Sequence, residues 1–511
     1  MKFNMNFRLK TPSFLSWFFA KITHLNFFLV GVLMNSLGYG TEVLDLEKKI
    51  KEVEQNLLPA VQIANQPPNQ YSIDERMAKY RIPSISIAVI NEGKLEWAKA
   101  YGVKKRESDN RASTVTLYQA GSVSKPVAAV GALILVQEGR INLDDNINEI
   151  LTSWQVPLNE YTKRRSVTLC HLLNHSAGFN VIGFDGYRNK DKLPSLFEIL
   201  EGLNPANNPS IHVGFVPGTT MSYSGGGYVV LQQLIEDVKQ QLFCEFMQQH
   251  LLLPLHMLNS TFECPLPSQY AAEAAYAHPG GNEMEGGCKN YPESATAGLW
   301  TTPTDLSKFI IAIQKALQSD SSIVLKKKTA EEMVKRSMPP YGLGPLINGE
   351  KETLEISHTG RTDGFVCGYV SYPYLGKGAV VMMNSDNGGC LVGEILRAIS
   401  TVYTWPSYHA VTRNVMTMNN NRLDFYLGRY STGDVKNDIY DVIVSKQGDG
   451  LVLQMGVASM PYKLHPVSED NFFVQETGYD IFFKEEQKQI TSLKIIVQEG
   501  FERTFRKLNV Q

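Results

Sequence analysis

Residues 117–138 read LYQAGSVSKPVAAVGALILVQE, and the long apolar run after Pro126 is typical of a buried helix, closed by Gly139. Ser122 and Lys125 stand three residues apart where this run begins, so one helical turn sets the lysine amine beside the serine hydroxyl. A serine is a weak nucleophile until a neighbouring group takes its proton, and a lysine with a lowered pKa can do so. The stretch therefore predicts a serine nucleophile and a lysine base at a helix N-terminus, where backbone N–H groups favour an oxyanion.

A Ser-x-x-Lys tetrad is expected by chance about once or twice in a chain of this length, so the context must decide. Five further stretches follow it in order: 138–145 (EGRINLDD), 167–178 (VTLCHLLNHSAG), Pro217-Gly218 followed by Tyr223-Ser224-Gly225, Ala297-Gly298-Leu299, and His358-Thr359-Gly360-Arg361. Together these stretches resemble the serine β-lactamase and penicillin-binding protein family, in its class C-like branch of β-lactamases, DD-peptidases and esterases. The resemblance covers about residues 75–405.

The resemblance implies a role for each matching residue. Ser122 would be the acylated nucleophile, Lys125 its activating base, and Tyr223 a partner in proton transfer to the leaving group. The backbone N–H groups of Ser122 and Arg361 would form the oxyanion hole. The substrate-binding strand would carry His358, Thr359, Gly360 and Arg361.

Two positions depart from the family pattern. The tyrosine motif usually ends in Asn, whereas position 225 is Gly, which offers no amide to a substrate. The third motif usually begins with Lys, whereas His358 would be mostly neutral at pH 7, so a fixed cation is lost. The Arg361 side chain either replaces that charge or points to solvent. These departures weaken the case for efficient penicillin hydrolysis and leave room for an esterase or a peptidase acting on D-amino-acid peptides.

The predicted fold class is α/β: an antiparallel sheet flanked by helices, with an inserted helical subdomain and a small C-terminal antiparallel β-barrel of lipocalin-like type. The family resemblance supplies this architecture. The hairpin at 84–101 and the apolar strand at 379–384 agree with it, and short alternating stretches after Leu423 predict the barrel. Apolar residues at helical spacing predict a helix over 42–64. We divide the chain into a signal or anchor (1–40), a hydrolase domain (41–408), a linker (409–421) and the barrel (422–511).

The first 40 residues carry only basic charges (Lys2, Arg8, Lys10, Lys21), then an apolar run at 25–34 and small residues around Gly38. This order predicts a secretory signal, with an uncleaved membrane anchor as the alternative, and hence an exported, periplasmic or secreted protein. Across all 511 residues, 49 Lys plus Arg against 51 Asp plus Glu leave no global basic field that would favour nucleic acid. Export permits disulfides, and Cys264 with Cys288 is a weak candidate pair.

Three other patterns have a structural and a functional interpretation. His171 and His175 have a metal-ligand spacing but no third ligand, so packing at a helix end is favoured and no metal is expected. Gly225-Gly226-Gly227 is better explained by a tight backbone beside Tyr223 than by a phosphate loop. The barrel aromatics Phe472, Phe473, Phe482 and Phe483 suggest a ligand cup or a cap over the site, although a small barrel normally fills its own interior.

The sequence thus predicts an exported serine hydrolase that cleaves a β-lactam, an ester or a D-amino-acid peptide through an acyl-enzyme on Ser122. No cofactor is needed, and the only partner expected is a small-molecule or peptide substrate. The alternatives are a carboxylesterase with little β-lactam activity and a non-catalytic penicillin-binding sensor or scaffold.

Overall fold

The computed structural model describes residues 44–320, 323–433, 441–456, 460–498 and 501–508. The predicted signal or anchor segment at 1–40 lies outside these residues. Within the described ranges, no helix combines the length and apolar character that a membrane crossing requires.

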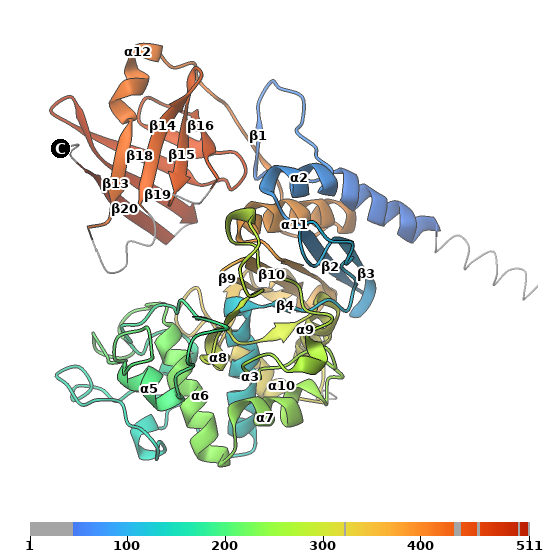
Figure 1. Cartoon of the computed structure of the whole chain (residues 1–511), viewed down its shortest axis with the longest axis vertical. Helices are drawn as coiled ribbons and strands as arrows, with labels where there is room; N and C mark the ends of the chain where they lie inside the picture. The colour runs from blue at the N-terminus through green and yellow to red at the C-terminus, as the bar shows by residue number, and fades with distance from the viewer. Residues whose placement is uncertain (1–43, 321–322, 434–440, 457–459, 499–500, 509–511) are drawn as a thin grey trace, which may run out of the picture.

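A six-stranded antiparallel sheet forms the centre of the molecule (Figure 1). Its strands, in spatial order, are β3 (Lys94–Gly102), β2 (Ser84–Asn91), β11 (Lys377–Met383), β10 (Phe365–Tyr372), β9 (Glu355–Thr362) and β8 (Leu346–Asn348). The predicted hairpin and the strand at 379–384 are confirmed as β2–β3 and β11. The central strands β10 and β11 are almost entirely buried because both faces of the sheet are covered.

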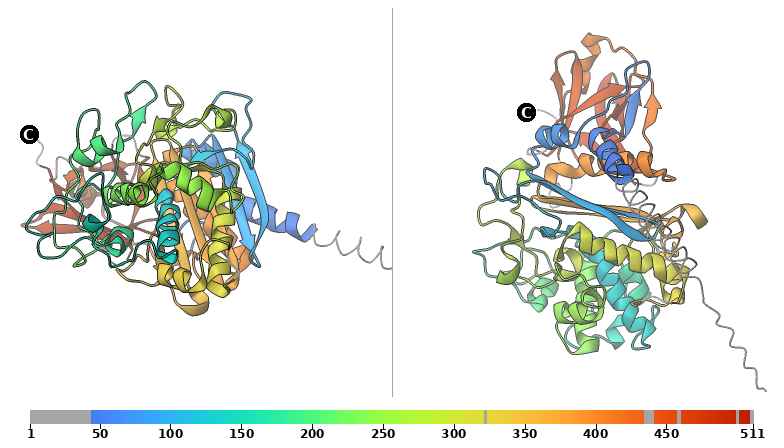
Figure 2. Two further views of the ribbon diagram at one scale, coloured as in Figure 1. Left: turned by 90° about the horizontal axis from the view of Figure 1, so that it is seen from below. Right: turned by 90° about the vertical axis from the view of Figure 1, so that its right-hand side faces the viewer.

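Helices cover the two faces of the sheet (Figure 2). One face packs against α3 (Ser124–Gln137) and α9 (Pro303–Gln318), with α10 (Lys327–Val334) beside them. The other face packs against α2 (Ile73–Tyr80), α11 (Gly389–Tyr403) and the N-terminal helix over residues 44–55. On β2, Ile85, Ile87 and Val89 point to this second face, as their alternation requires.

The inserted helical subdomain extends the α3 side of the sheet. It comprises α4 (Leu169–Leu173), α5 (Leu196–Glu201), α6 (Gly225–Lys239), α7 (Phe243–Met247) and α8 (Ser294–Ala297). Short pairs join its loops: β4 (Tyr118–Gln119) with β7 (Trp300–Thr301), and β5 (Tyr187–Arg188) with β6 (Lys289–Asn290). The β4–β7 pair ties the segment before Ser122 to the segment after α8, and both therefore lie near the N-terminus of α3.

A closed barrel follows the predicted hydrolase domain and lies on the α2–α11 side of the sheet (Figures 1 and 2). Its strands are β13 (Gly428–Ser431), β14 (Val442–Gln447), β15 (Gly450–Met455), β16 (Tyr462–Pro466), β17 (Asn471–Val474), β18 (Asp480–Glu486), β19 (Gln489–Gln498) and β20 (Phe501–Lys507). The fold class predicted from the sequence is confirmed in both parts. The barrel interior is filled by side chains, among them Phe472 and Phe483 packed edge to face.

Two local expectations were wrong. The stretch 42–64 is not one helix: after the helix over 44–55, β1 (Val61–Ile63) pairs in parallel with β12 (Val411–Arg413), which falls within the predicted linker. Cys264 and Cys288 are both free thiols rather than a disulfide. Burial raises the pKa of Cys264 to about 12 and that of Cys288 to about 11, so both stay protonated and unreactive.

Candidate active site

Ser122 lies in a tight turn between β4 and α3, against strand β9. Gly121 has a φ of +52°, and a Cβ there would lie 2.6 Å from the Arg361 nitrogen. A Cβ on Gly360 would lie 1.9 Å from the Ala120 oxygen and 2.9 Å from the Ser122 nitrogen. Glycine is required on both sides because the two backbones are in direct contact. The structure therefore brings Gly360 and Arg361 against the nucleophile turn.

Lys125 is buried, with 1% of its surface exposed, at the start of α3. Its Nζ donates hydrogen bonds to Ser122 Oγ at 3.0 Å and to the Thr296 carbonyl oxygen at 3.1 Å. Among the described residues no carboxylate forms an ion pair with it. Burial lowers the pKa of Lys125 to about 7, so a large fraction of the amine is neutral near pH 7. A neutral amine that donates to Thr296 has a lone pair for the Ser122 proton.

Tyr223 completes a group of three with Ser122 and Lys125. The Lys125 Nζ lies 4.9 Å from the centroid of the Tyr223 ring, and the Ser122 hydroxyl is near enough to the phenol to act on its pKa. Desolvation raises the pKa of Tyr223 well above its usual value, so the phenol stays protonated. The arrangement thus contains a nucleophile, a proton acceptor and a proton donor in mutual contact.

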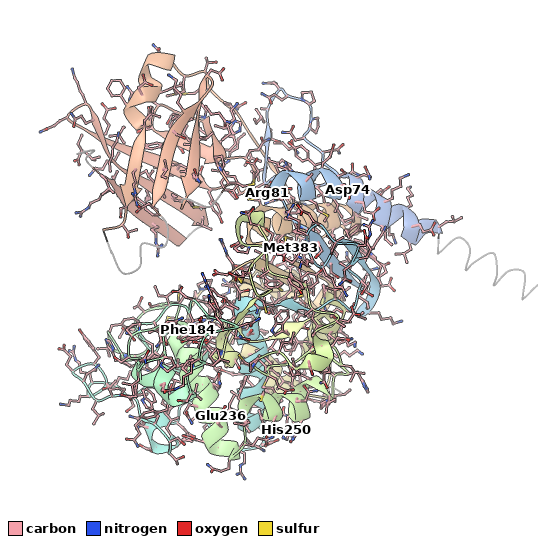
Figure 3. All side chains as sticks on the ribbon, in the orientation of Figure 1. Asp74, Arg81, Phe184, Glu236, His250 and Met383 are labelled. Carbon is pink, nitrogen blue, oxygen red and sulfur yellow. The ribbon has the colours of Figure 1, made fainter. Side chains whose placement is uncertain are left out.

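Position 225, directly after the tyrosine motif, is tightly enclosed by its neighbours. A Cβ there would lie 3.0 Å from the Ile182 oxygen, 3.1 Å from Phe184 Cε2 and 3.1 Å from Thr296 Cγ2. Figure 3 labels Phe184 on the part of the helical subdomain nearest the sheet. An aromatic ring therefore lies against the position from which the family pattern projects an amide. The backbone of the Gly225–Gly227 run starts helix α6, and the Gly227 N–H donates to Ser224 Oγ at 3.2 Å.

His358 lies on β9 and is 3% exposed. Its Nδ1 is 2.7 Å from the Thr359 carbonyl oxygen, and Nε2 has no partner among the described atoms. Burial, together with the nearby Lys125, lowers the pKa of His358 to about 3, so the ring is neutral. Thr359, beside it, is exposed.

The Arg361 side chain takes the second of its two predicted orientations. It is 54% exposed, and its Nη2 lies 3.3 Å from Asp386 Oδ2. Its charge is thus directed to solvent and partly balanced by a carboxylate. Only the Arg361 backbone lies at the nucleophile turn. Neither residue 358 nor residue 361 supplies an unpaired cation there.

The two histidines of the 171–178 stretch make hydrogen bonds, as the packing interpretation expects. His171 Nδ1 accepts from the Thr168 N–H at the start of α4, and His175 Nδ1 accepts from the Ser224 N–H, both at 3.2 Å. No group of three or more His, Cys, Asp or Glu side chains suited to a metal occurs in the described ranges.

Sequence reasoning missed three site residues. Thr296 holds Lys125 through its carbonyl, Tyr341 lies with its ring centroid 6.1 Å from that of Tyr223, and the His175 ring packs at a tilt on that of Tyr223, with centroids 4.4 Å apart. His175 lies in a stretch that the resemblance had already identified, and Thr296 directly precedes another. Tyr341 carried no signal, since only the tertiary fold brings it to Tyr223.

Two known proteins are similar to this chain in sequence. "Protein flp" of Staphylococcus aureus (strain MW2) is 25% identical over 327 residues, 62% of each chain, so the chain spans about three fifths of that relative's length. A "Putative D-alanyl-D-alanine carboxypeptidase" of Escherichia coli (strain K12) is 25% identical over 236 residues, 44% of this chain and 54% of that one.

Solved structures share the fold. The octameric penicillin-binding protein homologue from Pyrococcus abyssi superposes with a TM-score of 0.58 at 22% identity, covering 85% of this chain and 98% of that one. A beta-lactamase/D-alanine carboxypeptidase from Yersinia pestis reaches 0.50 at 17% identity, covering 63% and 96%. The profile of the Beta-lactamase family matches residues 71–399, more than half of the chain. The chain therefore belongs to the beta-lactamase family.

Proposed function

We propose that this chain is a serine hydrolase that cleaves an amide or ester bond through an acyl-enzyme on Ser122. The observation that carries the proposal is the buried Lys125 amine, which has a pKa of about 7 and lies 3.0 Å from Ser122 Oγ. A structural lysine gains nothing from burial without an anionic partner, whereas a general base near neutral pH needs a pKa lowered in this way.

In the first half-reaction, Lys125 Nζ takes the Ser122 proton as Oγ bonds to the substrate carbonyl carbon. The resulting oxyanion accepts hydrogen bonds from the backbone N–H groups of Ser122 and Arg361. The bond to the leaving group then breaks, the Tyr223 hydroxyl gives that group its proton, and the Lys125 ammonium reprotonates Tyr223. In the second half-reaction, water attacks the acyl carbonyl carbon and loses its proton by the reverse of these transfers. The ester bond to Ser122 Oγ then breaks, Oγ regains its proton, and the acid is released.

The test is intact-mass spectrometry after incubation with a penicillin, on wild type and Ser122→Ala in parallel. An adduct of penicillin mass on the wild type alone would support the proposal. Its rapid decay would indicate a β-lactamase, and slow decay a penicillin-binding peptidase or sensor. Turnover retained in Ser122→Ala would contradict the assignment.

A carboxylesterase is the second candidate, and specific observations favour it. His358 is neutral, the Arg361 charge is directed to solvent beside Asp386, and position 225 is a glycine with Phe184 packed against it. None of these residues would hold a penicillin carboxylate with an unpaired cation or its side-chain amide with an Asn. Hydrolysis of activated short-chain esters by wild type but not by Ser122→Ala, with no penicillin adduct, would select this function.

The cellular location belongs to the same proposal. The basic and apolar segment at 1–40 supports an exported enzyme. The proposed substrate is a small molecule or peptide, with no nucleic-acid partner.

A further inference from the structure

His175 is tied to the residues on both sides of Tyr223. The Ser222 N–H donates to the His175 carbonyl oxygen at 2.8 Å, and the Ser224 N–H donates to His175 Nδ1 at 3.2 Å. One residue therefore accepts from the backbone N–H groups of both residues that flank the tyrosine. These two bonds fix the direction in which the Tyr223 side chain leaves the backbone.

The His175 ring also fixes the tyrosine side chain. Its centroid lies 4.4 Å from that of Tyr223 and 4.8 Å from that of Tyr341, and only 2% of the residue is exposed. Close packing on these two rings leaves the imidazole little freedom to rotate. The phenol is thus held by ring packing as well as through its backbone.

His175 adopts this position at a conformational cost. Its φ is +60°, a left-handed conformation that non-glycine residues adopt rarely and at a cost of about 1 kcal/mol or more. The left-handed turn places both the carbonyl and the ring of one residue on the 222–224 segment. Burial and the nearby Lys125 lower the pKa of His175, so the ring stays neutral and Nδ1 remains an acceptor.

We propose that His175 is a positioning residue, which holds the Tyr223 hydroxyl where it protonates the leaving group. The inference rests on the proposed function, because it assigns His175 to the leaving-group step of that reaction. A positioning role for His175 differs in its consequences from a role that only stabilises the fold. A leaving group that needs no proton should be insensitive to His175, and one that needs a proton should depend on it.

The experiment compares two acetate esters, p-nitrophenyl acetate, whose leaving group departs as the anion, and ethyl acetate, whose alkoxide must be protonated. In His175→Leu we expect kcat/KM for the ethyl ester to fall about 100-fold, within the range for a general acid, and that for the nitrophenyl ester less than about five-fold. Tyr223→Phe should show the same selectivity, and the double variant should be no worse than the poorer single variant.

His171→Leu is the matched control, since it removes a buried histidine of the same stretch whose Nδ1 also accepts a backbone N–H. It should change both esters by the same factor. Equal losses on both esters in His175→Leu, or losses that multiply in the double variant, would overturn the inference. Should His175→Leu fail to fold, His175→Gln is measured in the same way. Absence of both a penicillin adduct and Ser122-dependent turnover of either ester by wild type would instead overturn the proposed function, and this inference with it.

Discussion

Two buried cations lie on opposite faces of the central sheet, and they are treated differently. Arg76, on α2, is 3% exposed, and its Nη2 lies 2.8 Å from Glu394 Oε1 on α11. The ring of Tyr71 lies 3.5 Å from its guanidinium carbon. Lys125, on α3, is just as buried, but its hydrogen-bond partners among the described residues are a hydroxyl and a carbonyl oxygen, with no carboxylate. The first cation is neutralised, and the second can lose its proton.

The difference teaches how to separate a structural charge from a chemical one. Burying a charge is costly unless it is paired, and an unpaired group responds by a shift of its pKa. Glu394 is fully buried, and its Oε1 accepts from the Tyr80 hydroxyl as well as from Arg76, so on this side of the sheet the buried cation is paired with a carboxylate. Lys125 is buried without an anionic partner among the described side chains, and this burial lowers the pKa of the amine so that it can act as a base.

The largest effect is expected from Lys125→Met, which removes the amine but keeps an apolar stem of similar length. Acylation of Ser122 should slow by about 10²–10⁴-fold, the usual contribution of a general base. Stability should not fall, because no charged partner is left behind. Acylation rates from intact mass and thermal unfolding midpoints test the two halves. Fast acylation in this variant would remove Lys125 from the mechanism.

Glu394→Gln tests the other side of the comparison. It leaves Arg76 buried without its anion, so the free energy of unfolding should drop by about 3–5 kcal/mol. The acylation rate of the folded protein should stay at the wild-type value, since Glu394 lies across the sheet from Ser122. Urea unfolding measures the first quantity, and acylation at a temperature below unfolding the second. An unchanged unfolding midpoint would show that the ion pair is not structural.

The pH dependence of acylation follows from the unpaired lysine alone. The neutral amine is the active form, so the rate should rise with pH up to about 7 and level off above it. Below pH 7 the rate should fall by about tenfold per pH unit, as for a single ionisation. His358, with a pKa of about 3, does not titrate near pH 7 and so adds no second step to the pH–rate profile in this range. Wild type and His358→Gln should therefore give the same midpoint, and a midpoint that moves would make His358 part of the titration.

Local patterns account for what the sequence could predict. The spacing of Ser122 and Lys125 is one helical turn, the β2–β3 hairpin closes through a short turn, and the barrel strands alternate. Each of these signals is contained in a few neighbouring residues. The contact between the predicted nucleophile and base could therefore be expected from sequence spacing alone, without knowledge of the tertiary fold.

What could not be predicted depends on distant segments. The segment of β1 was expected to be helical from its apolar spacing, but it forms a strand because it pairs with β12, which lies in the predicted linker, far along the chain. The direction of the Arg361 side chain is set by Asp386, and the environment of Lys125 by the Thr296 carbonyl. The role inferred for His175 needs the 222–224 segment folded against it. Spacing along the chain carries no information about such contacts.

The smallest effect is expected from a third cation, which lies on the barrel surface. Lys494 Nζ is 3.1 Å from Glu502 Oε2, and the two side chains are 38% and 57% exposed. Water solvates both charges in the folded and the unfolded chain, so the pair adds little. Lys494→Ala should change the free energy of unfolding by about 0–1 kcal/mol and the acylation rate not at all. A larger loss of unfolding free energy in urea would mean that ion pairs stabilise this chain even at its surface. Burial would then not explain why the Arg76 pair contributes more than the Lys494 pair.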